Sequence, residues 1–260
     1  MKKFWIGAGL VAALSLAGCG GGEKTAEGPK TESAAAPAGG GSATPDEANG
    51  GTVTGKVAFD GAKPTAKNID MSANPVCMRA HPGATPSEEV VINPNNTVKY
   101  AFVWVKSGLP DKNWQVPTSA VELDQQGCLY KPHVVGVMTG QPINIKNGDP
   151  TNHNIHPLPQ VNQEWNESQP PGSADKQQSF PRQEVLIPVK CNIHPWMRAY
   201  IGVVSHPFFA VTGDDGTYTL KGLPPGTYTI EIVHEKYGKQ EQQVTVGAKE
   251  SKTADFTIKG

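Results

Sequence analysis

The chain has 260 residues and a formal net charge of −1, with 23 Lys and Arg against 24 Asp and Glu. The basic residues form no cluster, which argues against a nucleic acid partner. The 29 Gly and 23 Pro, the frequent alternation of Val, Thr and Tyr, and the near absence of helical periodicity predict an all-β protein.

The N-terminus has the pattern of an export signal. A short basic region, Met1-Lys2-Lys3, is followed by an apolar run that ends at Cys19 and is too short for a transmembrane helix. The sequence LAGC at 16–19 resembles a bacterial lipobox. This resemblance implies a signal peptide over residues 1–18 and a lipid anchor on Cys19. Gly20 stands where an aspartate would favour the inner membrane, so we expect an outer-membrane anchor on the periplasmic face. An ordinary signal peptide with an incidental cysteine is the alternative.

Residues 19–51 contain no large apolar side chain. Such a segment cannot bury enough surface to offset the entropy of ordering it. We expect a disordered tether here, followed by a folded part over residues 52–260.

Four segments up to Cys191 have the composition or alternation of β-strands: 52–61, 99–108, 140–149 and 184–191. The dense apolar run in 99–108 predicts burial on both faces of that strand. Pro188 lacks an N–H group, so its strand is expected to lie at a sheet edge or to contain a bulge.

The C-terminal residues 207–260 form short strands broken by DDGT and PPGT turns. The run GTYTLKGLPPGTY at 216–228 resembles the carboxypeptidase regulatory-like family, which implies a small, transthyretin-type β-sandwich. That family opens with a G-x-V-x-F strand, which here stands far upstream, at 55–59. We therefore hypothesise that the strand at 52–60 pairs with the C-terminal module. A packing or spacer role without chemistry is expected for this module.

The segment CNIHPWM carries three candidate metal ligands, Cys191, His194 and Met197, in a loop where Pro195 prevents a regular helix. A thiolate, an imidazole and a thioether form a set that suits copper. Zinc would leave the methionine unused. A buried thiol in an ordinary core loop is the remaining alternative.

A trigonal copper site needs a second imidazole. The segment NGDPTNHNIH at 147–156 offers His153, which lies 38 residues before Cys191. His156 repeats the spacing of three residues and is expected to have a structural role.

These two segments resemble the type 1 copper site of the cupredoxin family, in its amicyanin-like form with a C-x-x-H-P-aromatic-M loop; plastocyanin-like loops are two residues longer. The resemblance implies a Greek-key β-sandwich within 52–206 that holds one copper ion. It assigns His153, Cys191 and His194 as equatorial ligands and Met197 as a weak axial ligand.

The same resemblance implies an outer shell around the ligands. Asn154 is expected to tie the two ligand-bearing segments together, Asn147 belongs to the same pattern, and Pro195 should stiffen the loop. Two positions depart from the family: Asn192 stands where many relatives have Ser or Thr, and Asn152 where amicyanin has proline. These departures concern the redox potential rather than the metal.

Cys77 and Cys128 remain once the other two cysteines are assigned. In an oxidising envelope compartment we expect them to form a disulfide. The alternative is a second metal site of the Cys₂His₂ type with His81 and His133.

Trp196, Pro195 and residues 157–159 are expected to surround an exposed edge of His194 and to form a docking patch for a redox partner. The sequence thus predicts a lipid-anchored electron carrier, not an enzyme, that serves envelope redox proteins such as a cytochrome or a dehydrogenase. Two alternatives stay open: a periplasmic copper storage or delivery protein, and a copper enzyme with an open coordination position.

Overall fold

The computed structural model describes residues 42–260. The predicted signal peptide, Cys19 and the first part of the tether lie outside the described residues. Within the described part, no helix is long and apolar enough to cross a membrane.

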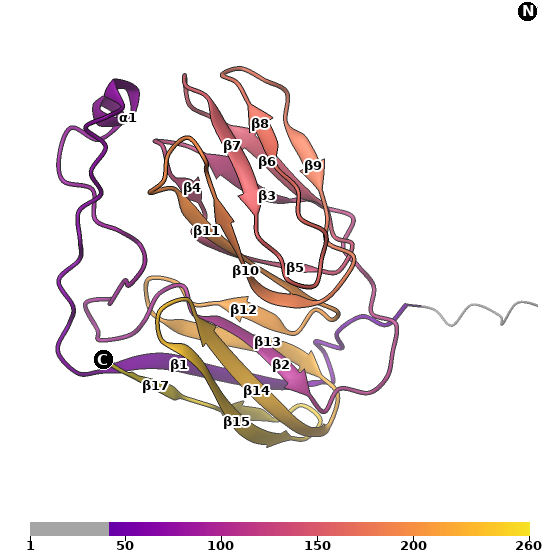
Figure 1. Ribbon diagram of the computed structural model, residues 1–260. Coiled ribbons are helices and arrows are strands. Elements are labelled where there is room, and N and C mark those ends of the chain that lie inside the picture. The colour runs from indigo at the N-terminus through magenta and orange to yellow at the C-terminus, as the bar shows by residue number, and fades with distance from the viewer. Residues whose placement is uncertain (1–41) are drawn as a thin grey trace, which may run out of the picture. The chain divides into compact units, whose positions relative to one another are not determined.

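The described residues form one short helix and 17 strands, which confirms the predicted all-β class (Figure 1). In chain order the elements are β1 (Gly51–Asp60), α1 (Pro75–Ala80), β2 (Phe102–Ser107), β3 (Val121–Gln125), β4 (Tyr130–Lys131), β5 (Val134–Met138), β6 (Ile143–Asn147), β7 (His153–Pro157), β8 (Glu167–Gln169), β9 (Lys176–Gln178), β10 (Glu184–Lys190), β11 (Arg198–Val204), β12 (Phe209–Val211), β13 (Thr217–Leu223), β14 (Gly226–His234), β15 (Gly238–Val246), β16 (Ser251–Thr253) and β17 (Phe256–Lys259).

One β-sandwich, called the outer sandwich, combines the first two strands, β1 and β2, with the last six, β12 to β17. In its first sheet β1 pairs with β13, β16 and β17, and in its second sheet the order is β12-β2-β14-β15. The hypothesis that the strand at 52–60 joins the C-terminal module is therefore confirmed. Apolar side chains from both sheets, such as Val57, Val103 and Ile230, fill one core.

The second sandwich, β3 to β11, is inserted between β2 and β12. Its sheets have the orders β5-β11-β10-β7-β8 and β4-β3-β6-β9. Its core contains Ile145, Ile155 and Val189 together with two of the predicted ligands, Cys191 and Met197. Figure 1 shows these strands in magenta to orange, with α1 beside them.

Strand β2 belongs to the outer sandwich, although the sequence placed 99–108 in the copper region. As predicted, it is buried on both faces. Val103 and Val105 point into the core of the outer sandwich, whereas Phe102 and Trp104 belong to a separate cluster that also contains Val204 of the inserted sandwich. Gly202 makes this contact possible, because a Cβ atom there would lie 2.3 Å from a Phe102 ring carbon.

Pro188 lies in β10, which pairs with both β11 and β7, so the prediction of an edge strand is wrong. The alternative prediction is a bulge, and the structure has one just before the proline. The register with β11 shifts between Glu184 and Ile187, and Leu186 has a φ of 56°. The bulge precedes the proline by two residues, and the Pro188 carbonyl still accepts a hydrogen bond from Leu158 at 2.8 Å.

The last ten residues of the expected tether, 42–51, differ from that expectation. The Ala43 N–H group donates to the Asn113 carbonyl at 2.7 Å, and Asp46 donates to the Gly222 carbonyl at 3.3 Å. Gly51 already belongs to β1. Backbone hydrogen bonds thus attach this segment to the outer sandwich without requiring any large apolar side chain.

Candidate metal centre

The loop between β10 and β11 carries three of the predicted ligands in a tight turn. Cys191 N–H donates to the Met197 carbonyl at 3.3 Å, and Met197 N–H donates to the His194 carbonyl at 2.9 Å. Cys191, His194 and Met197 are 2%, 1% and 0% exposed. The loop thus turns all three side chains away from solvent, while Ile193 and Pro195 remain exposed.

The fourth predicted ligand, His153, is the first residue of β7 and is fully buried. Its Nδ1 atom lies 2.9 Å from Nδ1 of His194, and the latter atom lies 3.8 Å from Sγ of Cys191. One nitrogen or sulfur atom from each of the three residues falls within 4.8 Å of the others. The structure therefore brings together two segments that are separated by 38 residues in the sequence.

These separations fit a shared metal ion. Nitrogen and sulfur ligands of a tetrahedral ion lie about 2.0–2.3 Å from it, so they are roughly 3–4 Å from one another. The Met197 backbone is fixed in the same loop, and its side chain belongs to the same core cluster as Cys191. That its thioether is the axial ligand remains a prediction.

Electrostatics favour the ligand forms of Cys191 and His194 but not of His153: burial alone would lower the pKa of His153, whereas its contacts with Asp149 and Cys191 raise it. Burial alone would raise the pKa of Cys191, but the contact with His153 and hydrogen bonds from backbone N–H groups lower it below its ordinary value. Burial, followed by the nearby charge of His153, lowers the pKa of His194. A metal site needs a thiolate and neutral imidazoles, so both shifts favour binding.

Asn154 connects the two ligand-bearing segments. Its Oδ1 atom accepts a hydrogen bond from the Asn192 N–H group at 2.8 Å and lies 3.3 Å from Cys191 Sγ. Its Nδ2 group donates to Asn166 at 2.7 Å. The contact uses the backbone of Asn192, so the missing Ser or Thr hydroxyl at that position is not required for it.

Asn147 organises the turn before His153. Its side chain donates to the carbonyls of Thr151 and Gln169 at 2.9 and 2.8 Å, and its Oδ1 atom accepts from the Asp149 N–H group at 3.0 Å. The asparagine therefore fixes the direction in which the chain enters β7.

His156 has both ring nitrogens engaged elsewhere. Nδ1 lies 3.1 Å from Asn192 Oδ1, and Nε2 lies 2.6 Å from Glu164. These contacts agree with the structural role expected for this residue.

Cys77 and Cys128 form a disulfide with an S–S distance of 2.03 Å. The alternative of a Cys₂His₂ metal site is therefore wrong, because neither sulfur is available as a thiolate. His81 contacts the Gly127 carbonyl at 2.5 Å, and His133 pairs with Glu235.

The disulfide places α1 over the ligand loop, and this contact was not expected from the sequence. Asn74, the N-cap residue of α1, has its Nδ2 atom 2.7 Å from Nε2 of His194. Both cysteine sulfurs lie within 4.8 Å of the same imidazole. The expectation of an exposed His194 edge is therefore wrong, because the chain covers this edge with its own helix.

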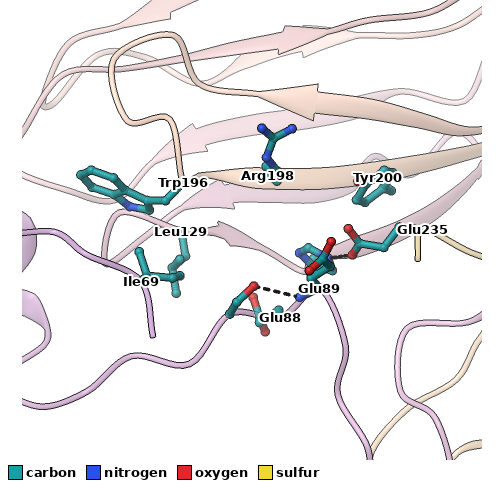
Figure 2. A pocket seen from close by; sticks show the side chains of 10 residues that line it. Ile69, Glu88, Glu89, Leu129, Trp196, Arg198, Tyr200 and Glu235 are labelled. Carbon is teal, nitrogen blue, oxygen red and sulfur yellow. Dashed lines mark hydrogen bonds and ion pairs between the residues drawn. The ribbon is translucent and has the colours of Figure 1, made fainter. Parts of the chain in front are cut away.

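Trp196 is also more constrained than a surface docking residue. Its indole N–H group donates to the Cys128 carbonyl at 3.1 Å, and its ring centroid lies 5.2 Å from that of His194. Trp196 lines a pocket of about 370 Å³. Figure 2 shows Trp196 at one end of this pocket and Arg198 and Tyr200 along β11. The half-buried indole packs against the loop at 127–128, called the disulfide loop because it carries Cys128. The large apolar side chains that are exposed on the ligand loop and on α1 are Ile193 and Met78, 49% and 48% exposed.

Two polar residues at the site were missed from the sequence, Asn74 and Asp149. Asp149 contacts Nε2 of His153 at 2.9 Å. A signal for it existed, because an acidic residue four positions before a candidate ligand histidine can reach that ring. Asn74 gave no such signal, since it lies 120 residues before His194.

Comparison with known proteins gives a family match for the last quarter of the chain. Residues 198–259 match the family model of the carboxypeptidase regulatory-like domain. The match begins in β11 of the inserted sandwich, nine residues before the boundary expected at 207. No curated protein matches the chain.

Solved structures similar to this chain include copper proteins. A purple cupredoxin from Nitrosopumilus maritimus is 17% identical over 32% of this chain and 98% of its own, with a TM-score of 0.28. A mutant of amicyanin in its Cu(I) state is 20% identical over 39% of this chain and 97% of its own, with a TM-score of 0.29. The Cu-containing nitrite reductase from Thermus scotoductus is 17% identical over 37% of this chain, with a TM-score of 0.31, and the chain spans a quarter of its length.

Proposed function

We propose that this protein is a cell-envelope electron carrier with one type 1 copper ion, held by His153, Cys191, His194 and Met197. The observation that carries the proposal is the convergence of two imidazole Nδ1 atoms and one thiol sulfur inside a β-sandwich core. A His₂Cys set with a weak axial methionine is the ligand set of blue-copper electron transfer. Copper bound there would exchange one electron by changing between its cupric and cuprous states.

The protein's contribution is a ligand geometry that stays the same in both states. Cys191 and Met197 are linked through their backbones, and Asn154 links the loop to β7. Residues packed in a sandwich core tolerate little displacement. Holding the ligands still keeps the reorganisation on electron transfer small, and no substrate needs to bind.

The burial of the site bears on the two alternatives. A copper delivery protein must release its metal readily, and a copper enzyme must admit a small molecule to the metal. His194 is 1% exposed and lies under Asn74. Both alternatives are therefore less well supported than electron transfer, and we propose that the protein is not an enzyme.

The envelope location belongs to the same proposal. A disulfide such as Cys77–Cys128 is typical of oxidising compartments. We propose export by the signal peptide at 1–18, lipid anchoring at Cys19 on the periplasmic face of the outer membrane, and redox partners such as a cytochrome or a dehydrogenase.

The test is metal analysis together with a visible spectrum of purified protein from a copper-replete culture. We expect one copper per chain and a strong thiolate-to-copper absorption, which Cys191→Ser abolishes. His156→Gln is the matched control and should keep both, because its ring contacts Asn192 and Glu164. A colourless, copper-free wild-type protein would refute the proposal. Rapid copper transfer to a chelator would favour delivery, and a spectrum that shifts with small anions would favour an open site.

A further inference from the structure

Asp149 binds one predicted ligand and the disulfide loop with the same carboxylate. Its Oδ2 atom lies 2.9 Å from Nε2 of His153 and accepts a hydrogen bond from the Cys128 N–H group at 2.7 Å. Its Oδ1 atom accepts from the Gly127 N–H group at 2.7 Å. The side chain is 8% exposed, so its position is set by these contacts rather than by solvent.

The contact determines which nitrogen of His153 faces the site. A carboxylate acts as an acceptor, so Nε2 of His153 carries the proton and Nδ1 keeps its lone pair. Nδ1 is the atom that lies 2.9 Å from His194 Nδ1 and faces the shared site. The imidazole is therefore held in the tautomer that a metal ion at this site requires.

We propose, on the basis of the copper site proposed above, that Asp149 is a positioning residue that strengthens His153 as a donor and lowers the reduction potential of the site. A carboxylate that accepts the remote N–H of a ligand imidazole raises the basicity of that ligand. The more highly charged cupric state gains more from a stronger donor than the cuprous state does.

The charge of Asp149 acts in the same direction. Among the ion pairs of the described residues, its partner is His153 alone, so no Lys or Arg neutralises it. A negative charge in a poorly solvated position attracts the cupric state more strongly than the cuprous state. Both effects oppose the uptake of an electron.

The other imidazole provides an internal comparison. The Asn74 amide nitrogen lies 2.7 Å from Nε2 of His194; an NH₂ group donates, so this partner, unlike Asp149, does not hold a proton on Nε2. The two ligand histidines therefore differ in their outer partner, a buried carboxylate for one and an amide for the other, and the effect should be confined to His153.

The experiment is a redox titration of the copper-loaded full chain, in which one electron is added at constant pH. Outer-shell partners typically change metal affinity by about 10–100-fold, and a tenfold change in the ratio of cupric to cuprous affinity corresponds to about 59 mV. We expect Asp149→Asn to raise the potential by about 60–120 mV, and Asp149→Glu, which keeps the charge, to restore most of the difference.

Glu164→Gln is the matched control, because it removes a carboxylate from the neighbouring histidine, His156, which is not a predicted ligand. We expect it to leave the potential close to that of the wild type. A blue, disulfide-bonded Asp149→Asn protein with the potential of the wild type or of this control would overturn the inference. The copper assignment itself would survive that result.

Asp149→Asn could also fail to fold, because the carboxylate holds the disulfide loop. Pulsed electron paramagnetic resonance of the wild-type copper protein then provides the test, through the remote nitrogens of the two imidazoles. We expect two different nitrogen environments, of which Asn74→Ala alters one. Two equivalent remote nitrogens would overturn the inference, whereas a protein that binds no copper would refute the proposed function on which it rests.

Discussion

Asn74 and His194 lie 120 residues apart in the sequence, and the Asn74 amide nitrogen lies 2.7 Å from Nε2 of the His194 ring. The Asn74 Oδ1 atom simultaneously accepts hydrogen bonds from the N–H groups of Val76 and Cys77, at 3.0 and 3.3 Å. One side chain thus begins the helix α1 and covers the edge of a predicted copper ligand. Access to this side of the site depends on how firmly the helix is held.

Replacing Asn74 with alanine should make the site more accessible. The change removes the contact with His194 and the N-cap of α1, which costs about 0.5–2 kcal/mol of helix stability. We expect a chelator to remove copper roughly 2- to 30-fold faster, since about 1.4 kcal/mol corresponds to a factor of ten in the population of an open state. Ser72→Ala, in the same exposed segment, is the control. Equal extraction rates for the two variants would contradict the covering role of Asn74.

The disulfide should contribute strongly to stability, because Cys77 and Cys128 are separated by 51 residues. The loop-entropy relation predicts about 4 kcal/mol for a loop of this length. We expect the double variant Cys77→Ala/Cys128→Ala to lose roughly this amount of unfolding free energy in urea denaturation. Reducing agent should destabilise the wild type and leave the double variant unchanged; equal sensitivity of the two would count against the bond.

Asn154→Ala should damage the ligand loop more than a surface change does. It leaves the Asn192 N–H group without its 2.8 Å partner and removes the oxygen beside Cys191 Sγ. A buried donor without a partner costs about 1–3 kcal/mol. The Asn192 N–H group is only partly buried, so we expect a loss of about 1 kcal/mol, at the lower end of this range, and a shifted thiolate-to-copper absorption band. Asn152→Ala, at an exposed neighbouring position, should change neither, and an unshifted band in Asn154→Ala would exclude the link to the thiolate.

The sequence was most informative where a feature depends on local spacing. The turn from Cys191 to Met197 is fixed by seven consecutive residues. The alternation in 52–61 and the dense apolar run in 99–108 identified both segments as strands. The strands with which these two segments pair could not be identified from local spacing. Strand β2 lies in the outer sandwich because it pairs with β12 and β14, which are distant in the sequence, and no local pattern encodes these pairings.

The cover over His194 could not be predicted for the same reason. A cysteine pair suggests a disulfide, but it does not show which third segment the linked loops contact. Asp149 lies within the segment 147–156 that also carries His153, and its role follows from side-chain reach rather than from a known motif.

Stability should fall in acid because of His206 in the outer sandwich. Burial is the main cause that lowers its pKa to about 4, while its contact with the Val105 carbonyl, at 2.8 Å, acts in the opposite direction. The folded pKa lies below the ordinary value of about 6.5, so the unfolded chain takes up the proton first. The stabilisation is therefore complete above about pH 6.5 and is lost as the pH falls toward 4.

Urea denaturation between pH 7 and pH 4 measures this effect. A shift of this size corresponds to about 3 kcal/mol for a buried imidazole. His206→Gln should show a shallower loss of stability with falling pH. His234, whose pKa burial also lowers to about 4, should account for part of the remainder. Parallel pH profiles for wild type and His206→Gln would contradict the assignment.

The C-terminal module should not fold when it is separated from the start of the chain. Residues 207–260 contain β12 to β17, but β1 lies between β13 and β16, and β2 lies between β12 and β14. Without these two strands, both sheets lose the member that joins their other strands, and the core loses Val53, Val57 and Val103. We expect a fragment of residues 207–260 to show an unfolded circular dichroism spectrum, and a mixture with a peptide of residues 50–61 to remain unfolded because β2 is still missing. A cooperative thermal transition in the fragment alone would show that the module is independent, and the inserted arrangement of the two sandwiches would then not be needed for its folding.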